Sequence, residues 1–305
     1  MKLHHIRNVV AVVDRGSLRA AAKHLGLAQP AMSRSIKELE DELGVVLFER
    51  NKFGMTLTDA GELFVRRARG MQAELQRTLD EMGQFKGEAV GTVTVAFSGA
   101  AMLAFLPRIM ASFRRRFPKV RIKVVEGTFP MLEKDIRDGL IDLYYGAVSK
   151  GFNDPALMIQ VLFENGRIIV GRRGHPLSNA TTLEELVNAE WVTTPVAIHD
   201  DNEVNAAFEA AGLPTPHIAM QASSGMSVTT IVATSDLLAP LPQQYLEVID
   251  ATDRLVRIPV RDVPNAPRVC AIQRANMPLT PAADYINDLV LRAAAIHVRK
   301  SGVRV

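Results

Sequence analysis

Four polar side chains near the N-terminus have the types and the spacing needed to bind a polyanion. They are Gln29, Ser33, Arg34 and Lys37. These residues share one face if their segment is helical, and no carboxylate precedes Glu38 within it. Arginine and lysine neutralise phosphates, and glutamine and arginine also hydrogen-bond the edges of bases. The group therefore favours contact with double-stranded DNA.

Two short helices joined by a tight turn would present that face. Ser17 can cap a first helix over residues 18–25, because its hydroxyl accepts a hydrogen bond from the first turn. Gly26 suits the left-handed conformation that ends a helix, and Pro30 suits the first turn of the next helix. Apolar residues at helical spacing predict one buried stripe opposite the polar face: Met32, Ile36, Leu39 and Leu43. This pattern is typical of a helix-turn-helix, whose second helix lies in the major groove.

An ordinary pair of antiparallel helices with a solvated basic face would show part of this pattern. Three features favour DNA binding instead. The run Ala20–Ala22 permits close helix contact, and the acidic residues within 38–42 stand away from the start of the second helix. Residues 45–58 then predict a short β-wing that carries the cations Arg50 and Lys52 at its tip.

The string from Ala21 to Gly61 resembles the N-terminal domain of the LysR-type transcriptional regulators. It has the pattern AAxxLxxAQPAxSRxIxxLExxLGxxLFERxxxxxxLTxAG, and the match extends from residue 3 to about residue 90. Ala28 stands where the family often has Ser, so a hydrogen bond at the start of the second helix is expected to be missing. Phe53 stands at a wing position that is commonly Arg, which puts one groove or phosphate contact in doubt.

The predicted DNA-binding residues are Ser17, Gln29, Pro30, Ser33, Arg34, Lys37, Arg50 and Lys52. Gln29 and Arg34 are expected to contact base edges, whereas the three remaining cations mostly hold phosphates. A helix over residues 3–14 should support the pair. Its expected inward residues are Leu3, Ile6, Val9, Val10 and Val13, and its expected surface residues are His4 and His5.

A single long helix is predicted from its N-cap, Thr58, to about Lys86. Its apolar positions recur at spacings of three and four: Ala60, Leu63, Phe64, Ala68, Met71, Leu75, Leu79, Met82 and Phe85. Such a helix extends about 43 Å, and so narrow a module cannot cover the stripe with its own chain. An antiparallel helix from a second copy would cover it, which predicts a homodimer through residues 59–86. Gly83, Gly87 and Gly91 mark a hinge.

Composition limits the remaining possibilities. The 305 residues are 48% hydrophobic and 23% charged, and the formal charge of +3 equals that of residues 1–57 alone. A positive potential must therefore be local. The single cysteine, Cys270, excludes disulfides within the chain and a multi-cysteine metal site, and its apolar neighbours predict a buried thiol. Neither a signal peptide nor a membrane-spanning run is recognised, so a cytoplasmic, nucleoid-associated protein is expected.

From Thr92 onward, predicted strands and helices alternate. The strands are expected at 92–97, 120–126, 141–148, 167–171, 191–194, 218–222, 237–240, 255–260 and 268–274. The helices are expected at 103–117, 130–139, 183–188, 204–211, 226–235, 243–249 and 282–298. The first three strands with two helices form a βαβαβ unit, which implies parallel strands. We therefore expect two α/β subdomains joined by two crossings, near Leu162 and near Ala266.

The predicted fold class is α/β with an N-terminal all-α winged helix-turn-helix. Residues 1–58 would form the DNA-binding domain, 59–90 the linker helix with its hinge, and 91–305 an effector-binding domain. Its subdomain I would comprise 91–161 and 267–305, and its subdomain II would comprise 162–266. The resemblance implies a likeness of this domain to periplasmic binding proteins. It also implies a homotetramer of two dimers, which would contact RNA polymerase if it activates transcription.

Ligands of open α/β sheets lie outside the carboxyl ends of the strands. Hydroxyl and small residues that open helices occupy those ends and suit an anion without a buried cation. The predicted effector-binding residues are Ser98, Gly99, Ala100, Thr128, Phe129, Ala147, Thr194, Ser223, Ser224 and Met226. Each hydroxyl alone could be an ordinary helix cap, but their convergence favours a small carboxylate or sulfonate packed against Phe129 and Met226. No arginine clamp, cofactor or metal cluster is apparent.

An enzyme is disfavoured, because the chain lacks a P-loop, a GxGxxG after a strand, HExxH and GxSxG. The triplet His199-Asp200-Asp201 could serve acid–base or metal chemistry, but it is more typical of a loop that caps a helix. A free-standing solute-binding protein is the alternative class, and a gel shift would separate it from a regulator. Within the LysR family, residues 175–181, 235–238 and 279–283 resemble the toluenesulfonate-responsive regulators.

Overall fold

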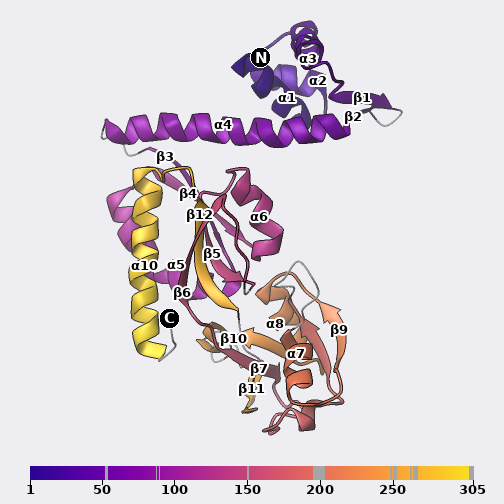
Figure 1. Ribbon diagram of the computed structural model, residues 1–305, viewed down its shortest axis with the longest axis vertical. Helices are drawn as coiled ribbons and strands as arrows, with labels where there is room; N and C mark the ends of the chain where they lie inside the picture. Colours follow the sequence, from indigo (N-terminus) through magenta and orange to yellow (C-terminus); the bar gives the residue numbers. More distant parts are fainter. Residues whose placement is uncertain are drawn as a thin grey trace. The chain divides into compact units, whose positions relative to one another are not determined.

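The computed structural model describes residues 1–51, 54–86, 88, 90–149, 151–194, 203–247, 249, 253–261, 263 and 267–301 (Figure 1). The chain divides into two compact units. The first comprises Met1–Met82 with Asp138–Leu140, and the second comprises Gly83–Arg137 with Ile141–Val305. No helix of the described residues is both long enough and apolar enough to cross a membrane.

Three helices form the core of the first unit: α1 (Leu3–Arg15), α2 (Leu18–Leu25) and α3 (Gln29–Leu43). Ser17 caps α2, because its Oγ accepts a hydrogen bond from the N–H of Ala20 at 3.2 Å. Gly26 ends α2 with a φ of +66°, in the left-handed region. Ala28 precedes α3 without a side-chain cap, which confirms the missing hydrogen bond predicted from the sequence.

Three residues of this unit differ from the sequence prediction. Leu3 is 65% exposed and Leu43 is 39% exposed, because each stands at an end of its helix, beyond the core. His5 is buried rather than at the surface. Burial lowers the pKa of His5 below its ordinary value, since the imidazolium would lose its water.

A two-stranded wing and a long helix complete the unit: β1 (Phe48–Asn51), β2 (Gly54–Leu57) and α4 (Asp59–Phe85). The two strands pair antiparallel. Thr58 caps α4 as predicted, because its Oγ1 accepts from the N–H of Gly61 at 2.9 Å and donates to the carbonyl of Val46 at 2.7 Å. A Cβ on Gly61 would lie 2.1 Å from the carbonyl oxygen of Leu47. The start of α4 therefore packs directly on the backbone that leads into the wing.

The apolar stripe of α4 is largely uncovered within one chain. Val65 and Ala68 are buried in the unit. The exposed large apolar side chains of the helix are Leu63, Met71, Leu75, Leu79, Met82 and Phe85. Their exposed fractions range from 42% at Leu75 to 82% at Phe85. A contiguous apolar stripe of this length is stabilised when a partner surface covers it.

A five-stranded sheet organises the first half of the second unit: β3 (Gly91–Phe97), β4 (Val120–Glu126), β5 (Leu143–Val148), β6 (Leu157–Phe163) and β12 (Arg268–Arg274). The strand order is β4-β3-β5-β12-β6. β3 runs parallel to β4 and β5, whereas β12 runs antiparallel to β5 and β6. The helices α5 (Gly99–Arg116) and α10 (Pro281–Ser301) cover one face, and α6 (Phe129–Arg137) covers the other (Figure 1).

The second half repeats this arrangement with shorter elements. Its strands are β7 (Arg167–Arg172), β8 (Glu190–Thr193), β9 (His217–Gln221), β10 (Ala239–Pro242) and β11 (Leu255–Ile258). Its helices are α7 (Glu203–Ala210) and α8 (Gly225–Ala233), with 3-10 turns η1 (Glu184–Leu186) and η2 (Gln243–Tyr245). The packing of α8 and η2 defines one apolar core, and the packing of α7 and η1 defines another.

Each strand of the second half has a counterpart in the first half, with the same neighbours and directions. β8 runs parallel to β9, and an isolated parallel bridge joins Trp191 to Leu238 beside β10. β7 then lies between β10 and β11 and is antiparallel to both. β7 therefore occupies the position in its sheet that β12 occupies in the other. In both sheets, the start of an antiparallel strand lies at the edge where the parallel strands end.

Several elements differ from the sequence prediction. β6 was not expected, because its residues form an apolar run, interrupted only by Gln160, at the point where the chain was expected to cross between halves. α5 begins at Gly99 rather than Leu103, since Ser98 caps it and the helix continues through Pro107. The helix expected at 183–188 includes only the short 3-10 turn η1, whereas the helix expected at 243–249 begins as the 3-10 turn η2 and is α-helical at Leu246, Glu247 and Ile249. The proposed crossing at Ala266 lies outside the described residues.

Candidate functional site

The polar face of α3 is exposed, as the helical spacing predicted. Gln29, Pro30, Ser33, Arg34 and Lys37 are all exposed. The opposite face is buried through Met32, Ser35, Ile36 and Leu39. Neither Arg34 nor Lys37 forms an ion pair with another described residue. Both cations are therefore available to an external anion.

Three polar residues that sequence reasoning missed hold this face in place. Asn8 of α1 donates its Nδ2–H to Oγ of Ser35 at 2.8 Å, and both side chains are buried. Glu40 accepts through Oε1 from the N–H of Leu47 at 2.7 Å and of Phe48 at 3.2 Å. The first contact sets α3 against α1, and the second sets the wing against α3. A polar residue inside an apolar helical stripe, as at Asn8 and Ser35, was the available signal.

The remaining predicted DNA-binding residues have other positions. Ser17 is partly buried, and its hydroxyl accepts the capping hydrogen bond of α2. The backbone of Arg50 lies in β1, whereas Lys52 and the substituted wing position Phe53 lie outside the described residues.

A cavity lies in the second unit where the ends of both sheets meet, and its empty space is about 680 Å³ including the part open to solvent. Eight of the ten residues predicted to bind an effector line it: Ser98, Gly99, Ala100, Thr128, Ala147, Thr194, Ser223 and Ser224. The strand ends of the two halves thus converge on one cavity.

The two other predicted residues are elsewhere. Phe129 is buried in the core beneath the first sheet, where its ring centroid lies 5.7 Å from that of Tyr144 and 4.8 Å from that of Phe152. Met226 is 74% exposed and does not line the cavity. Both residues lie in the first turn of a helix, where side chains point outward from the helix axis and not along it toward the cavity. The expected apolar wall at these positions is therefore wrong.

Three helices begin at the cavity and supply hydrogen-bond donors. Ser98 caps α5 by accepting from the N–H of Ala101 at 3.4 Å, and Ser224 caps α8 by accepting from the N–H of Ser227 at 3.2 Å. Thr128 precedes α6, and its Oγ1 is buried without a hydrogen-bond partner among the described residues. The first N–H groups of a helix have no partner inside the helix and favour negative charge. These three helix starts can bind an anion.

Tyr245 lies between two of these helix starts. A Cβ on Gly99 would lie 2.1 Å from its Oη, and a Cβ on Gly225 would lie 1.7 Å from the same atom. The phenol therefore contacts the first residue of α5 and the first residue of α8. Burial raises the pKa of Tyr245 to about 12, with a further rise from Glu126 that Arg167 opposes. Tyr245 is neutral at physiological pH and joins the two halves across the cavity.

The cavity also holds charged residues that sequence reasoning missed. Arg167 is 6% exposed in its side chain and binds Oε2 of Glu203 through Nη2 at 2.8 Å and Nε at 2.9 Å. Burial raises the pKa of Glu203 despite the opposing attraction of Arg167. An arginine therefore lines the cleft, but it is paired with Glu203, and the expectation that no arginine clamp is present stays a prediction. Glu126 also lines the cavity, at the carboxyl end of β4.

Other candidates for reactive chemistry were the single cysteine, metal-ligand clusters and one acidic triplet. Cys270 is buried as predicted, and burial raises the pKa of its thiol to about 11. No group of three or more potential metal ligands occurs among the residues that the structure describes. The triplet His199-Asp200-Asp201 lies outside the described residues.

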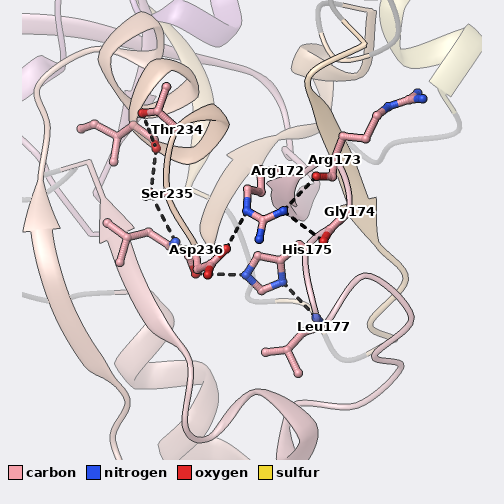
Figure 2. Close-up of polar contacts among 10 residues, drawn as sticks. Arg172, Arg173, Gly174, His175, Leu177, Thr234, Ser235 and Asp236 are labelled. Atoms are coloured by element: carbon pink, nitrogen blue, oxygen red, sulfur yellow. Dashed lines mark hydrogen bonds and ion pairs between the residues drawn. The ribbon is translucent and has the colours of Figure 1, made fainter.

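Two of the sequence runs that suggested a subgroup form one polar network in the second half (Figure 2). Arg172 binds Asp236 through Nε at 2.6 Å and also donates to the carbonyls of Arg173 and Gly174. His175 accepts at Nδ1 from the N–H of Leu177, and its Nε2 lies 3.0 Å from the carbonyl oxygen of Asp236. None of these residues lines the cavity. The network holds the turn after β7 against the turn before β10. These two sequence runs therefore stabilise the second half and do not contact the cavity.

A helix-turn-helix with an exposed donor face, a wing, and an α/β domain with a cavity between two halves define a ligand-responsive DNA-binding regulator. Comparison with known families agrees with that class. The family described as "LysR substrate binding domain" matches residues 86–295, and "Bacterial regulatory helix-turn-helix protein, lysR family" matches residues 3–62. The chain belongs to the LysR family of transcriptional regulators, which are not enzymes.

Individual relatives cover nearly the whole chain. The transcriptional regulator TdcA of Escherichia coli K12 is 27% identical over 288 residues, which are 94% of this chain and 92% of TdcA. The crystal structure of CbnR, a LysR family regulator, has a TM-score of 0.74 at 22% identity and covers 96% of this chain and 99% of CbnR. CbnR in complex with its target DNA has a TM-score of 0.72 at 23% identity, over 96% of this chain and 100% of that one. These structures share the fold of this chain.

Proposed function

We propose that α3 reads operator DNA through the exposed face described above. Gln29 and Arg34 contact base edges, and Lys37 holds phosphates together with Arg50 and Lys52 of the wing. The observation that carries this proposal is the position of Arg34 and Lys37, which are exposed, without an ion-pair partner among the described residues, and held by the buried Asn8–Ser35 hydrogen bond. Such a role places the protein at the nucleoid, in the cytoplasm.

The proposed assembly is a homodimer through α4 and a homotetramer of two such dimers. The exposed stripe from Leu63 to Phe85 supports the dimer, because it runs along most of the helix. In the proposed division of the chain, residues 1–58 bind DNA, 59–90 link and dimerise, and 91–305 bind the effector. Subdomain I was expected to comprise 91–161 and 267–305, and subdomain II 162–266; Leu162 and Phe163 are better assigned to subdomain I, because β6 pairs with β12. RNA polymerase is a further partner if the regulator activates transcription.

The proposed effector is a small organic acid, either a carboxylate or a sulfonate, bound in the cavity. The starts of α5, α6 and α8 support an anionic group, and Thr128 offers an unpartnered hydroxyl. An arenesulfonate such as toluenesulfonate is one member of this class. The runs at 175–181 and 235–238 lend it little weight, since they belong to the network of Figure 2.

The DNA proposal is tested with fragments selected by the wild-type protein from genomic DNA. Fluorescence anisotropy would compare Arg34→Ala and Lys37→Ala on a selected fragment and on random DNA, over a range of salt concentrations. Arg34→Ala should lose about 1–3 kcal/mol on the selected fragment and little on random DNA. Lys37→Ala should weaken both and reduce the salt slope by about one. Lys134→Ala, an exposed lysine of α6, is the matched control and should change neither. Intact preference in Arg34→Ala would refute the assignment.

The effector proposal is tested by thermal shift with aromatic and aliphatic acids, neutral sugars, amines and divalent metals. A ligand at 100 times its Kd stabilises the folded state by about 2.7 kcal/mol. Only compounds with an acid group should raise Tm, and the double variant Ser98→Ala, Thr128→Ala should lose the response. The double variant should have a lower Tm than the wild type even without ligand, because it lacks the cap of α5, so this Tm is measured first. A response to a sugar or a simple amine, or a full acid response in the double variant, would exclude this site.

A further inference from the structure

The charges of the cavity are not balanced among its own residues. Three charged side chains line it: Glu126, Arg167 and Glu203. Arg167 and Glu203 neutralise each other through two short contacts to one carboxylate oxygen. The side chain of Glu126 has no ion pair and no hydrogen bond with any residue that the structure describes. One carboxylate of the cavity therefore lacks a countercharge.

Glu126 lies close to the place where an anionic group would bind. It is the last residue of β4, directly opposite Phe97 in the pairing with β3, and Ser98 follows Phe97 at the start of α5. Its Oε1 would be 3.7 Å from a Cβ on Gly99, and its charge contributes to the raised pKa of Tyr245. A purely anionic ligand at the start of α5 would thus face a like charge a few ångströms away. Like charges at such distances repel each other, and water screens part of that repulsion because Glu126 is exposed.

The same cavity also supplies hydrogen-bond donors. Gly225 begins α8 and Phe129 begins α6, and the residues before them, Ser224 and Thr128, line the cavity, so two further helix starts offer backbone N–H groups to an anion. The Thr128 Oγ1 is buried without a partner among the described residues, which marks a group that a ligand would complete. The cavity thus offers donors for an anion and, separately, one acceptor for a cation.

We infer that the effector is a zwitterionic acid, such as an amino acid, whose protonated nitrogen binds Glu126 while its carboxylate binds the helix starts. This inference rests on the proposed function and narrows its class of ligand. The paired Arg167 does not take the carboxylate directly; it holds Glu203 so that Glu126 is the only free carboxylate among the described residues of the cavity wall. Removal of either charged group from the ligand leaves one side of the cavity unmatched.

The test uses the full-length protein and isothermal titration calorimetry with matched pairs of ligands. The common L-amino acids form one set, and the same acids without the amino group form the other, for example L-leucine with 4-methylpentanoate and L-phenylalanine with 3-phenylpropanoate. At least one amino acid should bind, and its partner without nitrogen should bind at least 10-fold more weakly. Equal or tighter binding by the partner would overturn the inference, as would the absence of binding by every amino acid.

Two variants locate the charge. Glu126→Gln keeps the shape of the side chain and should raise the Kd of the amino acid at least 10-fold. The Kd of the matched acid without the amino group should stay the same or fall. Glu209→Gln removes an exposed carboxylate of α7 that does not line the cavity, and it should change neither Kd. An unchanged ratio between the two ligands in Glu126→Gln would overturn the inference. If plain acids bind and amino acids do not, the inference of a zwitterionic effector is wrong while the proposed regulator function stands. If the wild-type protein shows no preference for the selected fragment over random DNA, the proposed function itself is wrong.

Discussion

Substitution of Gly99 by alanine tests whether Tyr245 holds the two halves of the second unit together. The added Cβ would lie 2.1 Å from Oη of Tyr245 and 3.3 Å from its Cζ. Ordinary contacts between heavy atoms lie near 3.5 Å, so the hydroxyl must withdraw by about 1.4 Å. Tyr245 is buried between the starts of α5 and α8 and cannot withdraw without moving its neighbours. The steric conflict is confined to one atom, the phenol oxygen.

The expected cost is that of overpacking, about 1–3 kcal/mol, partly offset by the gain of up to about 1 kcal/mol when glycine in a helix becomes alanine. A domain of this size changes its Tm by about 2–4 °C per kcal/mol. Gly99→Ala should therefore lower the Tm of the second unit by several degrees in a thermal unfolding experiment. The cavity should be distorted at the same time, which any ligand found in the screens above would report as weaker binding.

Tyr245→Phe supplies the internal control. It removes Oη and leaves Cζ at 3.3 Å from the new Cβ of Gly99→Ala, so the double variant should recover the loss. Gly225→Ala is the matched contrast, because its Cβ would lie 2.4 Å from Cζ and 2.9 Å from Cε1 as well as 1.7 Å from Oη. Tyr245→Phe should not rescue it. Equal rescue of both alanines, or of neither, would refute the placement of the phenol between the helix starts.

Three further predictions concern other parts of the molecule. Leu75→Glu should dissociate the assembly in sedimentation experiments, because it puts a charge into the proposed seam of α4, while Leu75→Met should not. The pKa of His5 lies below its ordinary 6.5, so the folded unit binds fewer protons than the unfolded chain near that pH, and stability should fall as pH drops through 6.5. His5→Leu should lose this component, measured by urea unfolding at several pH values; an unchanged pH dependence would contradict it. Phe129→Ala should cost about 3–5 kcal/mol of stability, whereas Met226→Ala should cost almost none; equal effects would contradict their assigned burial.

Much of the fold followed from local pattern. The caps Ser17 and Thr58 and the strands Val120–Glu126 and Arg268–Arg274 lie where the sequence predicted them, because capping residues and apolar periodicity act over a few neighbours. The strand β6 was missed, since a short apolar run has the same composition whether it forms a buried strand or a connection. Its assignment depends on β12, which is distant in the sequence.

The site was predictable to the extent that it depends on parallel strands. The rule that ligands lie beyond the carboxyl ends of strands located Ser98, Ala147 and Ser223. Arg167 stands at the beginning of an antiparallel strand and faces Pro242, so it reaches the same edge from the other direction. Strand direction is a property of the whole sheet, and residue spacing does not reveal it. Glu126 was overlooked because it is the last residue of a strand, one position before the segment that was considered.

The central place of β12 in the first sheet has a consequence for the order of folding during synthesis. β5 and β6 are not neighbours, because β12 lies between them and pairs with both. While the ribosome makes residues 164–267, the sheet has two unpaired inner edges, which are prone to association with other chains. The strands of the second half all lie between Arg167 and Ile258, so that half can complete its pairing first. The nascent first half must wait for its last strand, and chaperone binding at that stage would protect it.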